Sequence, residues 1–208
     1  MDESKFKHKI TQKLILDAKE KYSDEFFVIA IPGFMSKQFN AYSFMIDEIK
    51  TVEKYCNELK QNHSKLIRSA LTYSAITLYA KCFMDASKGN APKLESNQIF
   101  KDEKDKEIHE YLMELRHKFL VHRNKNNAEI EASFFLVPKN ESMETAVRHL
   151  ATRQISFHEE KLEEIIQHLQ VMKTIIQSKV ENAAKKVQKG LLNLDEQITK
   201  HLIVNNVK

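Results

Sequence analysis

The chain contains few of the residues that make tight turns. Among its 208 residues there are three glycines and three prolines, and tryptophan is absent. β-Sandwiches, barrels and doubly wound sheets need many turns, so this composition argues against all three. Hydrophobic residues make up 42% of the chain and charged residues 30%, which also argues against intrinsic disorder. We therefore expect a mainly α-helical protein with long helices.

Cysteine and long apolar runs are also scarce. Cys56 and Cys82 are far apart and form no Cys-x-x-Cys pair, so we expect neither a zinc site nor a disulfide framework, but two reduced core residues. The longest apolar run, 26–31, is far shorter than the ~20 residues that cross a bilayer. The first ten residues lack the apolar core of a secretory signal. We expect a cytoplasmic protein that needs no membrane, metal or cofactor.

Hydrophobic spacing predicts the helices. Residues 4–22 are compatible with a helix, followed by a connector that Pro32-Gly33 interrupts. A second helix over about 64–86 has a wide apolar arc, which includes Leu66 and Ile67, and should be the most buried helix. Two narrower stripes have spacings of three and four and each predict a packed helix: Met45, Ile49, Val52, Cys56 and Leu59, then Ile108, Leu112, Leu115 and Phe119.

The pattern changes after the last of these stripes. Apolar and polar residues alternate over 130–137 and, more weakly, over 146–155, which predicts a β-hairpin within 129–156 packed on the helices. Ser156 and Glu159 resemble a capping box at the start of a long helix, for which Gly190 is a candidate end. Residues 191–207 fit a short final helix or a frayed tail. We therefore expect an N-terminal helix and connector over 1–36, and a helical domain over 37–208 with C-terminal helices over 157–208.

The sign of the charge reverses within one short segment. Residues 101–114 contain six acids and three lysines, whereas residues 115–128 contain four cations, two histidines and no acid. On an ideal helix of ~100° per residue, Arg116 and His122 flank the apolar stripe on opposite sides, about 9 Å apart along the axis. One phosphate lying across the end of this helix could therefore be reached by both side chains.

An arginine and a histidine in this arrangement suit phosphodiester chemistry. A guanidinium binds phosphate oxygens and keeps its charge, while an imidazole exchanges a proton near neutral pH. RNA supplies its own nucleophile in the 2′-hydroxyl, so the reaction requires no metal. We expect Arg116 to stabilise the charged phosphorane and His122 to act as base or acid. Unpaired RNA suits this role better than a duplex, because its backbone can adopt the in-line geometry.

The segment LRHKFLVHRN resembles the signature of the HEPN superfamily (higher eukaryotes and prokaryotes nucleotide-binding). That signature is an arginine, four to six residues, and a histidine; five residues separate Arg116 from His122, and His117 occupies the favoured polar position after the arginine. The preceding helix, which ends LYAKCFMDAS, resembles the abortive-infection and toxin branch. The resemblance covers roughly residues 64–128.

The resemblance implies a helical bundle that forms a homodimer with one composite cleft. Many members are metal-independent endoribonucleases that act as toxins or antiphage effectors, so RNA and an antitoxin or defence-system protein are the expected partners. In that setting Arg116 and His122 are catalytic, and the other residues expected at the site are His117 and Asn124 in support and Lys118, Arg123 and Lys125 as RNA contacts. The alternative is a non-catalytic HEPN-like module that binds a nucleotide or a protein.

Each of these residues also has a simpler interpretation. Arg116 could be a surface cation paired with Glu110 or a nearby aspartate, and His122 a histidine favoured by the helix dipole. Asn124 suits a cap, and the three cations a solvated helix end. Glu114 and His117 have di-iron spacing, but a second Glu-x-x-His is missing. A helical scaffold without any RNA role is therefore a third interpretation.

Overall fold

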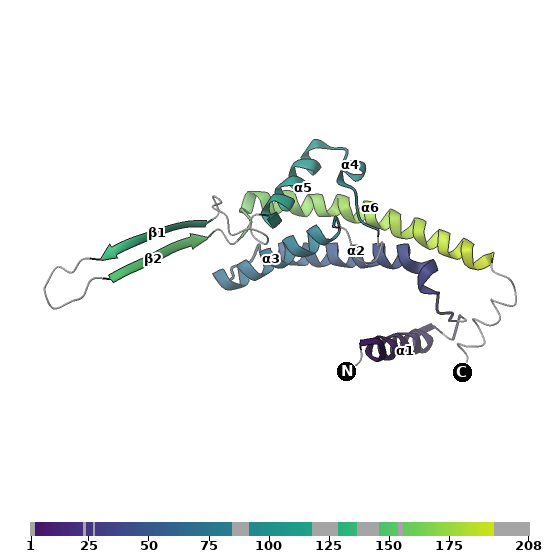
Figure 1. The fold of residues 1–208 in the computed structure, drawn as a ribbon. Coiled ribbons are helices and arrows are strands. Elements are labelled where there is room, and N and C mark those ends of the chain that lie inside the picture. The colour runs from purple at the N-terminus through teal and green to yellow at the C-terminus, as the bar shows by residue number, and fades with distance from the viewer. Residues whose placement is uncertain are drawn as a thin grey trace. The chain divides into compact units, whose positions relative to one another are not determined.

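The protein is mainly helical, with one small hairpin. A computed structural model describes residues 3–22, 24–26, 28–84, 92–117, 129–136, 146–153 and 156–193. Its elements, in chain order, are α1 (Glu3–Tyr22), α2 (Gly33–Glu58), α3 (Lys65–Lys81), α4 (Ser96–Ile99), α5 (Glu103–Arg116), β1 (Glu129–Leu136), β2 (Ala146–Arg153) and α6 (Glu159–Leu192) (Figure 1). The predicted fold class is confirmed, including the hairpin between the motif helix α5 and the long helix α6. None of the described helices is both long enough and apolar enough to cross a membrane.

The chain forms two compact units. The first comprises residues 1–40 and 179–208, and the second comprises residues 41–178. Helices α2 and α6 each contribute one end to the first unit and the rest of their length to the second. The second unit also contains α3, α5 and the hairpin, and it therefore contains the predicted site.

The core of the second unit is built on α2 and α6. The predicted stripe on α2 is buried throughout, from Met45 at 7% exposed to Ile49 and Cys56 at 0%. On α6 the buried apolar residues of this unit are Leu162, Ile165, Ile166, Leu169, Met172 and Ile176. Ion pairs Lys60–Glu163 (2.7 Å) and Glu53–Lys173 (2.8 Å) join the two helices and show that they run antiparallel. Periodicity alone was enough to locate these faces.

Both cysteines lie in this core. Cys56 and Cys82 are buried and free. Burial raises the pKa of each thiol to about 12, because the thiolate is poorly solvated there. They therefore pack as small apolar residues, as the sequence predicted.

Helix α3 differs from its prediction at both ends. It ends at Lys81 rather than near residue 86, and its first turn is exposed: Leu66 is 80% and Ile67 46% accessible. The second half of the helix is buried instead, including Ile76 and Tyr79 at 0%. A wide apolar arc does not specify which part of a helix meets its neighbours, so the expectation of burial at Leu66 and Ile67 was wrong.

The hairpin forms where it was predicted but is not packed as predicted. β1 and β2 pair antiparallel from Glu129↔Arg153 to Leu136↔Ala146. The described side chains are exposed on both faces, for example Phe134 at 44% and Phe135 at 64%. Alternation identifies a strand, but it cannot tell whether the apolar face finds a neighbour within the same chain. The expected packing on the helices is therefore absent among the described side chains.

Two helix boundaries in the first unit differ from those expected. The N-terminal helix and connector are expected over 1–36, yet α2 begins at Gly33, and the Pro32 carbonyl accepts from the backbone N–H groups of Met35 (2.9 Å) and Ser36 (3.2 Å). Gly190 lies inside α6 rather than ending it. A Cβ at Gly190 would lie 3.1 Å from Cε of Met35, so this glycine permits close packing of α2 and α6.

The two ends of α3 provide a test of which face forms the core. We expect Ile76→Ala to lower the free energy of unfolding by about 2–5 kcal/mol, because it leaves a cavity at a fully buried position. Leu66→Ala on the same helix is the matched control, and its cost should stay within about 0.5 kcal/mol. Urea denaturation of both variants measures the difference. Equal losses would contradict the assignment of the buried face.

Candidate functional site

Helix α5 ends at Arg116, the first residue of the predicted motif, and begins with a side-chain cap. The Asp102 carboxylate accepts a hydrogen bond from the backbone N–H of Lys104 at 2.8 Å. Glu103 and Asp105 follow in the first turn, where negative charge interacts favourably with the helix dipole. Ile108, Leu112 and Leu115 are buried, as their spacing predicted. The orientation of α5 is thereby set, and with it the direction of every other side chain on the helix.

Arg116 is the last residue of α5 and is only partly buried. Within the described ranges, its guanidinium forms neither a hydrogen bond nor an ion pair, so pairing with Glu110 is not observed. His117 caps the helix, its backbone N–H directed at the carbonyls of Glu114 and Met113, and its side chain is exposed. Among the described residues, the Arg116 side chain is therefore neither fully buried nor paired.

The other predicted site residues lie outside the described part of the chain. These are His122, Asn124, Lys118, Arg123 and Lys125. Their roles, and the convergence of His122 with Arg116, stay predictions. Of the expected site, the structure places the arginine and the histidine that follows it.

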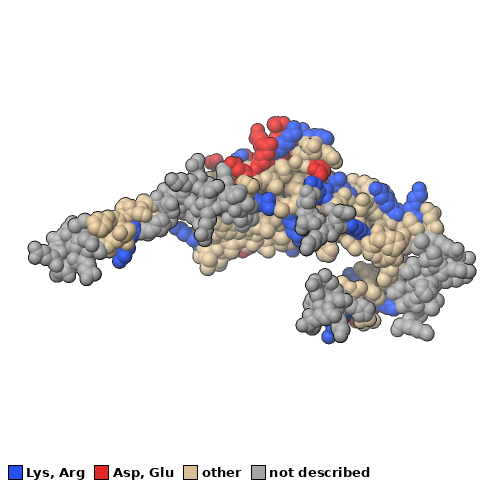
Figure 2. Space-filling view, in the orientation of Figure 1, with Lys and Arg blue, Asp and Glu red and all other residues tan. Residues whose placement is uncertain are grey.

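The acidic residues of α5 lie on a different side of the helix from Arg116. Glu103, Glu107, Glu110 and Glu114 are exposed and repeat at four, three and four residues, which makes one acidic stripe. At ~100° per residue, this stripe lies roughly 120–180° around the axis from Arg116. Figure 2 shows the acidic side chains gathered over α5. The acidic stripe and Arg116 therefore face different sides of α5.

Sequence reasoning missed a chain of hydrogen bonds on the Arg116 side of α5. The Tyr79 hydroxyl on α3 lies 2.8 Å from Nδ1 of His109 on α5 and 2.9 Å from Nε2 of His168 on α6. Nδ1 of His168 lies 2.7 Å from Oδ1 of Asp105, again on α5. Four polar side chains thus join three helices. We call Asp105, His168, Tyr79 and His109 the polar chain.

The direction of each hydrogen bond follows from the carboxylate at one end. The Asp105 carboxylate can only accept, so Nδ1–H of His168 donates to it. Burial lowers the pKa of His168, although Asp105 opposes the shift, so burial favours the neutral ring. Its Nε2 therefore accepts from the Tyr79 hydroxyl, whose oxygen in turn accepts from Nδ1–H of His109. Asp105 thus determines the tautomer of His109 from three links away.

Aromatic rings enclose the polar chain. The His109 ring centroid lies 4.4 Å from that of Phe83 and 5.3 Å from that of Phe100. Tyr79 is fully buried, and the side chain of His168 is 1% exposed. Hydrogen bonds are stronger in such a low-dielectric setting, and an unpaired polar atom there is correspondingly costly. Burial also raises the pKa of Tyr79 well above its ordinary value, so the hydroxyl keeps its proton.

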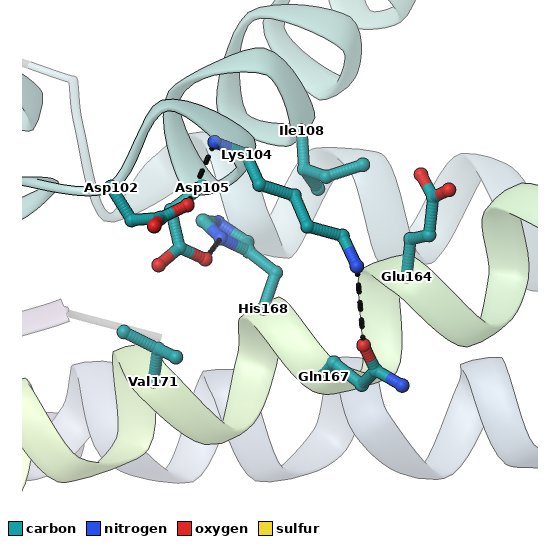
Figure 3. Close-up of a pocket in the computed structure, with 8 residues that line it drawn as sticks. All are labelled: Asp102, Lys104, Asp105, Ile108, Glu164, Gln167, His168 and Val171. Carbon is teal, nitrogen blue, oxygen red and sulfur yellow. Dashed lines mark hydrogen bonds and ion pairs between the residues drawn. The ribbon is translucent and has the colours of Figure 1, made fainter.

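A pocket of about 170 Å³ borders the acidic end of the polar chain (Figure 3). It lies between the start of α5 and the middle of α6, with Asp105 and His168 in its wall. Lys104 Nζ donates to Gln167 Oε1 at 3.5 Å on one side of it. In the described part of the chain, no group of three or more histidine, cysteine or acidic side chains could hold a metal ion.

The sequence contains a signal for the polar chain, but that signal is not specific. Asp105 and His109 are four residues apart, and His168 stands within an apolar run of α6. A lone histidine or tyrosine among apolar residues is usually part of a core. Only the approach of three helices reveals that these residues bond to one another.

Comparisons with known proteins add no assignment. The chain matches no family model, no curated protein and no solved structure. Any function must therefore be argued from the residues and their geometry.

The polar chain makes a prediction for stability. Tyr79→Phe should lower the free energy of unfolding by about 1–3 kcal/mol, because two buried imidazole nitrogens lose their partner. Tyr111→Phe on α5 is the matched control: within the described ranges the Tyr111 hydroxyl is buried without a partner, so its removal should be neutral or stabilising. Chemical denaturation of both variants measures the effect. A neutral Tyr79→Phe would show that the hydroxyl contributes nothing.

A second prediction concerns pH. Burial lowers the pKa of His109 from 6.5 to about 4, with the neighbouring His168 as a smaller cause. A depressed histidine pKa means that the unfolded chain binds the proton first, so stability falls as the pH decreases from about 6.5 towards 4. Urea midpoints at pH 7, 6 and 5 should decrease in this order. His109→Gln should flatten the dependence, and an unchanged slope would exclude His109 as its source.

Proposed function

We propose that this chain is a metal-independent endoribonuclease that cleaves single-stranded or loop RNA through a composite site of a homodimer. The observation that carries the proposal is Arg116: a partly exposed guanidinium at the end of α5, without an ion pair among the described residues. Buried or paired, this side chain could not bind a phosphate. Arg116 stands in a HEPN-like sequence, and that resemblance implies a role as a toxin or an antiphage defence effector in the cytoplasm.

The surroundings of α5 are compatible with this function. The buried stripe and the polar chain attach the helix to α3 and α6, and a catalytic group must be held within a fraction of an ångström. The acidic stripe lies away from Arg116, so a phosphate backbone can approach that side without facing four carboxylates. Free, buried cysteines are in keeping with a reducing compartment.

The proposed reaction uses the RNA as its own nucleophile. His122 accepts the proton of the 2′-hydroxyl, and the 2′-oxygen attacks the adjacent phosphorus. Arg116 stabilises the charge on the phosphorane oxygens. The 5′-oxygen leaves with a proton from the second histidine of the dimer, which yields a 2′,3′-cyclic phosphate and a 5′-hydroxyl. A two-fold axis supplies both the acid and the base, which one subunit alone lacks.

A second candidate function is supported by the hairpin. Its exposed apolar side chains, including Phe135 at 64% and Leu150 at 66%, are typical of a surface that binds another protein. An isolated two-stranded hairpin is marginally stable in water, so a partner would stabilise it. This favours a protein-binding role, either as the non-catalytic alternative or as the contact with an antitoxin.

Mutation of the motif tests the nuclease. We expect Arg116→Ala to slow cleavage of single-stranded RNA by about 10²- to 10³-fold and His122→Ala by about 10²- to 10⁴-fold. Arg148→Ala, on the exposed hairpin, is a matched control that removes an arginine distant from the motif in sequence. Denaturing gels follow the cleavage, and circular dichroism checks the fold of each variant.

EDTA should leave the wild-type rate unchanged, because no step of the proposed reaction uses a metal. Equal inertness of wild type and both motif variants over a range of RNAs would leave the binding module as the better description.

A further inference from the structure

At the His109 end of the polar chain, the hydrogen bonds determine which ring nitrogen carries the proton. Because Nδ1 of His109 donates to Tyr79, the proton of the neutral ring is on Nδ1 and the lone pair is on Nε2. Among the described residues Nε2 has no hydrogen-bond partner, yet it is not one of the buried unpaired side-chain atoms. His109 as a whole is only partly buried. His109 thus presents a hydrogen-bond acceptor, because its hydrogen bond to Tyr79 keeps the proton on the other ring nitrogen.

This acceptor lies on the same side of α5 as Arg116. The two residues are seven positions apart, which is two helical turns, so they differ by only ~20° around the axis and by about 10.5 Å along it. Both are partly buried rather than fully enclosed. A single strand whose phosphate binds Arg116 can thus bring a neighbouring base to His109.

The ring of His109 is also positioned to recognise a base. It is held by Phe83 and Phe100, at centroid distances of 4.4 and 5.3 Å, and Phe83 is itself partly exposed. Unpaired bases stack on aromatic side chains and are then distinguished by hydrogen bonds to their edges. A fixed acceptor beside such rings favours a base that presents a hydrogen-bond donor at that point of its edge.

The geometry points to a base-recognition subsite at His109, in which Nε2 accepts a hydrogen bond from the exocyclic amino group of an unpaired base. Adenine, cytosine and guanine carry such a group, and uracil does not. The inference rests on the proposed function, since it requires that RNA binds at Arg116. Asp105, His168 and Tyr79 act as positioning residues, because they hold the His109 tautomer in place and do not touch the base.

The test compares two RNAs that differ only in that amino group. One is a fluorescein-labelled 2′-O-methyl oligoadenylate of ten nucleotides, which the proposed reaction cannot cleave. The other is the same oligomer with purine riboside, which retains the stacking surface but lacks the 6-amino group. Fluorescence anisotropy with the wild-type protein should show tighter binding of oligoadenylate by about 2- to 12-fold, the value of one net hydrogen bond.

Three variants identify the source of the preference. His109→Phe retains an aromatic ring without an acceptor and should abolish the preference. Tyr79→Phe releases the tautomer and should reduce it, whereas Tyr111→Phe, the control used for stability, should retain it. Nitrogen-15 NMR of the histidine rings gives an independent measurement, with the proton of His109 expected on Nδ1 in the wild type.

The outcomes separate this inference from the nuclease proposal. If the wild-type protein cleaves RNA but binds both oligomers equally, the subsite is wrong and the nuclease stands. If His109→Phe keeps the preference, or the NMR shows the proton on Nε2, the subsite is likewise wrong. If the wild type neither binds nor cleaves RNA, both proposals fail together.

Discussion

One hydroxyl group links three helices of this protein through hydrogen bonds. Tyr79 belongs to α3, yet its oxygen bonds to an imidazole of α5 and an imidazole of α6, at 2.8 and 2.9 Å. Because the group is fully buried, water cannot replace either partner, and a rotation of any of the three helices leaves a polar atom unpaired. Because the Asp105 carboxylate can only accept, all the hydrogen bonds of the polar chain point in the same direction, from His109 towards Asp105. A local constraint thereby becomes a constraint on the orientation of α5.

That orientation resolves an apparent contradiction in α5. The helix is rich in acids, yet the segment that it begins is expected to bind an anion. With the apolar stripe buried and the polar chain in place, the glutamates Glu103, Glu107, Glu110 and Glu114 face one way and Arg116 another. The four exposed glutamates are thus separated from Arg116 around the helix as well as along it. The same arrangement places His109 two turns from Arg116, on the same side of the helix.

The errors of the sequence-based prediction share one origin. Pro32-Gly33, Gly190, Leu66 and the hairpin were each assigned from local chemistry, and each outcome depends on a distant segment. Gly190 lies within α6, and a Cβ there would be only 3.1 Å from Cε of Met35, so the packing of a distant residue favours glycine at this position. The hairpin keeps its predicted pairing but exposes its apolar residues. The local sequence pattern predicted which secondary structure each segment forms. It failed to predict which other segments pack against that structure.

Periodicity in the chain was sufficient to predict helices, a hairpin and most of the core, because burial of one face imposes a repeat of 3.6 or 2 on the residues. Arg116 was singled out by the reversal of charge along the chain and by its spacing from His122. The polar chain was beyond the reach of periodicity, since Tyr79 is 30 residues from His109 and 89 from His168. A hydrogen bond requires the donor–acceptor distance to lie within a few tenths of an ångström of about 2.9 Å. That distance depends on the packing of three helices at once, and no pattern along a single helix contains it.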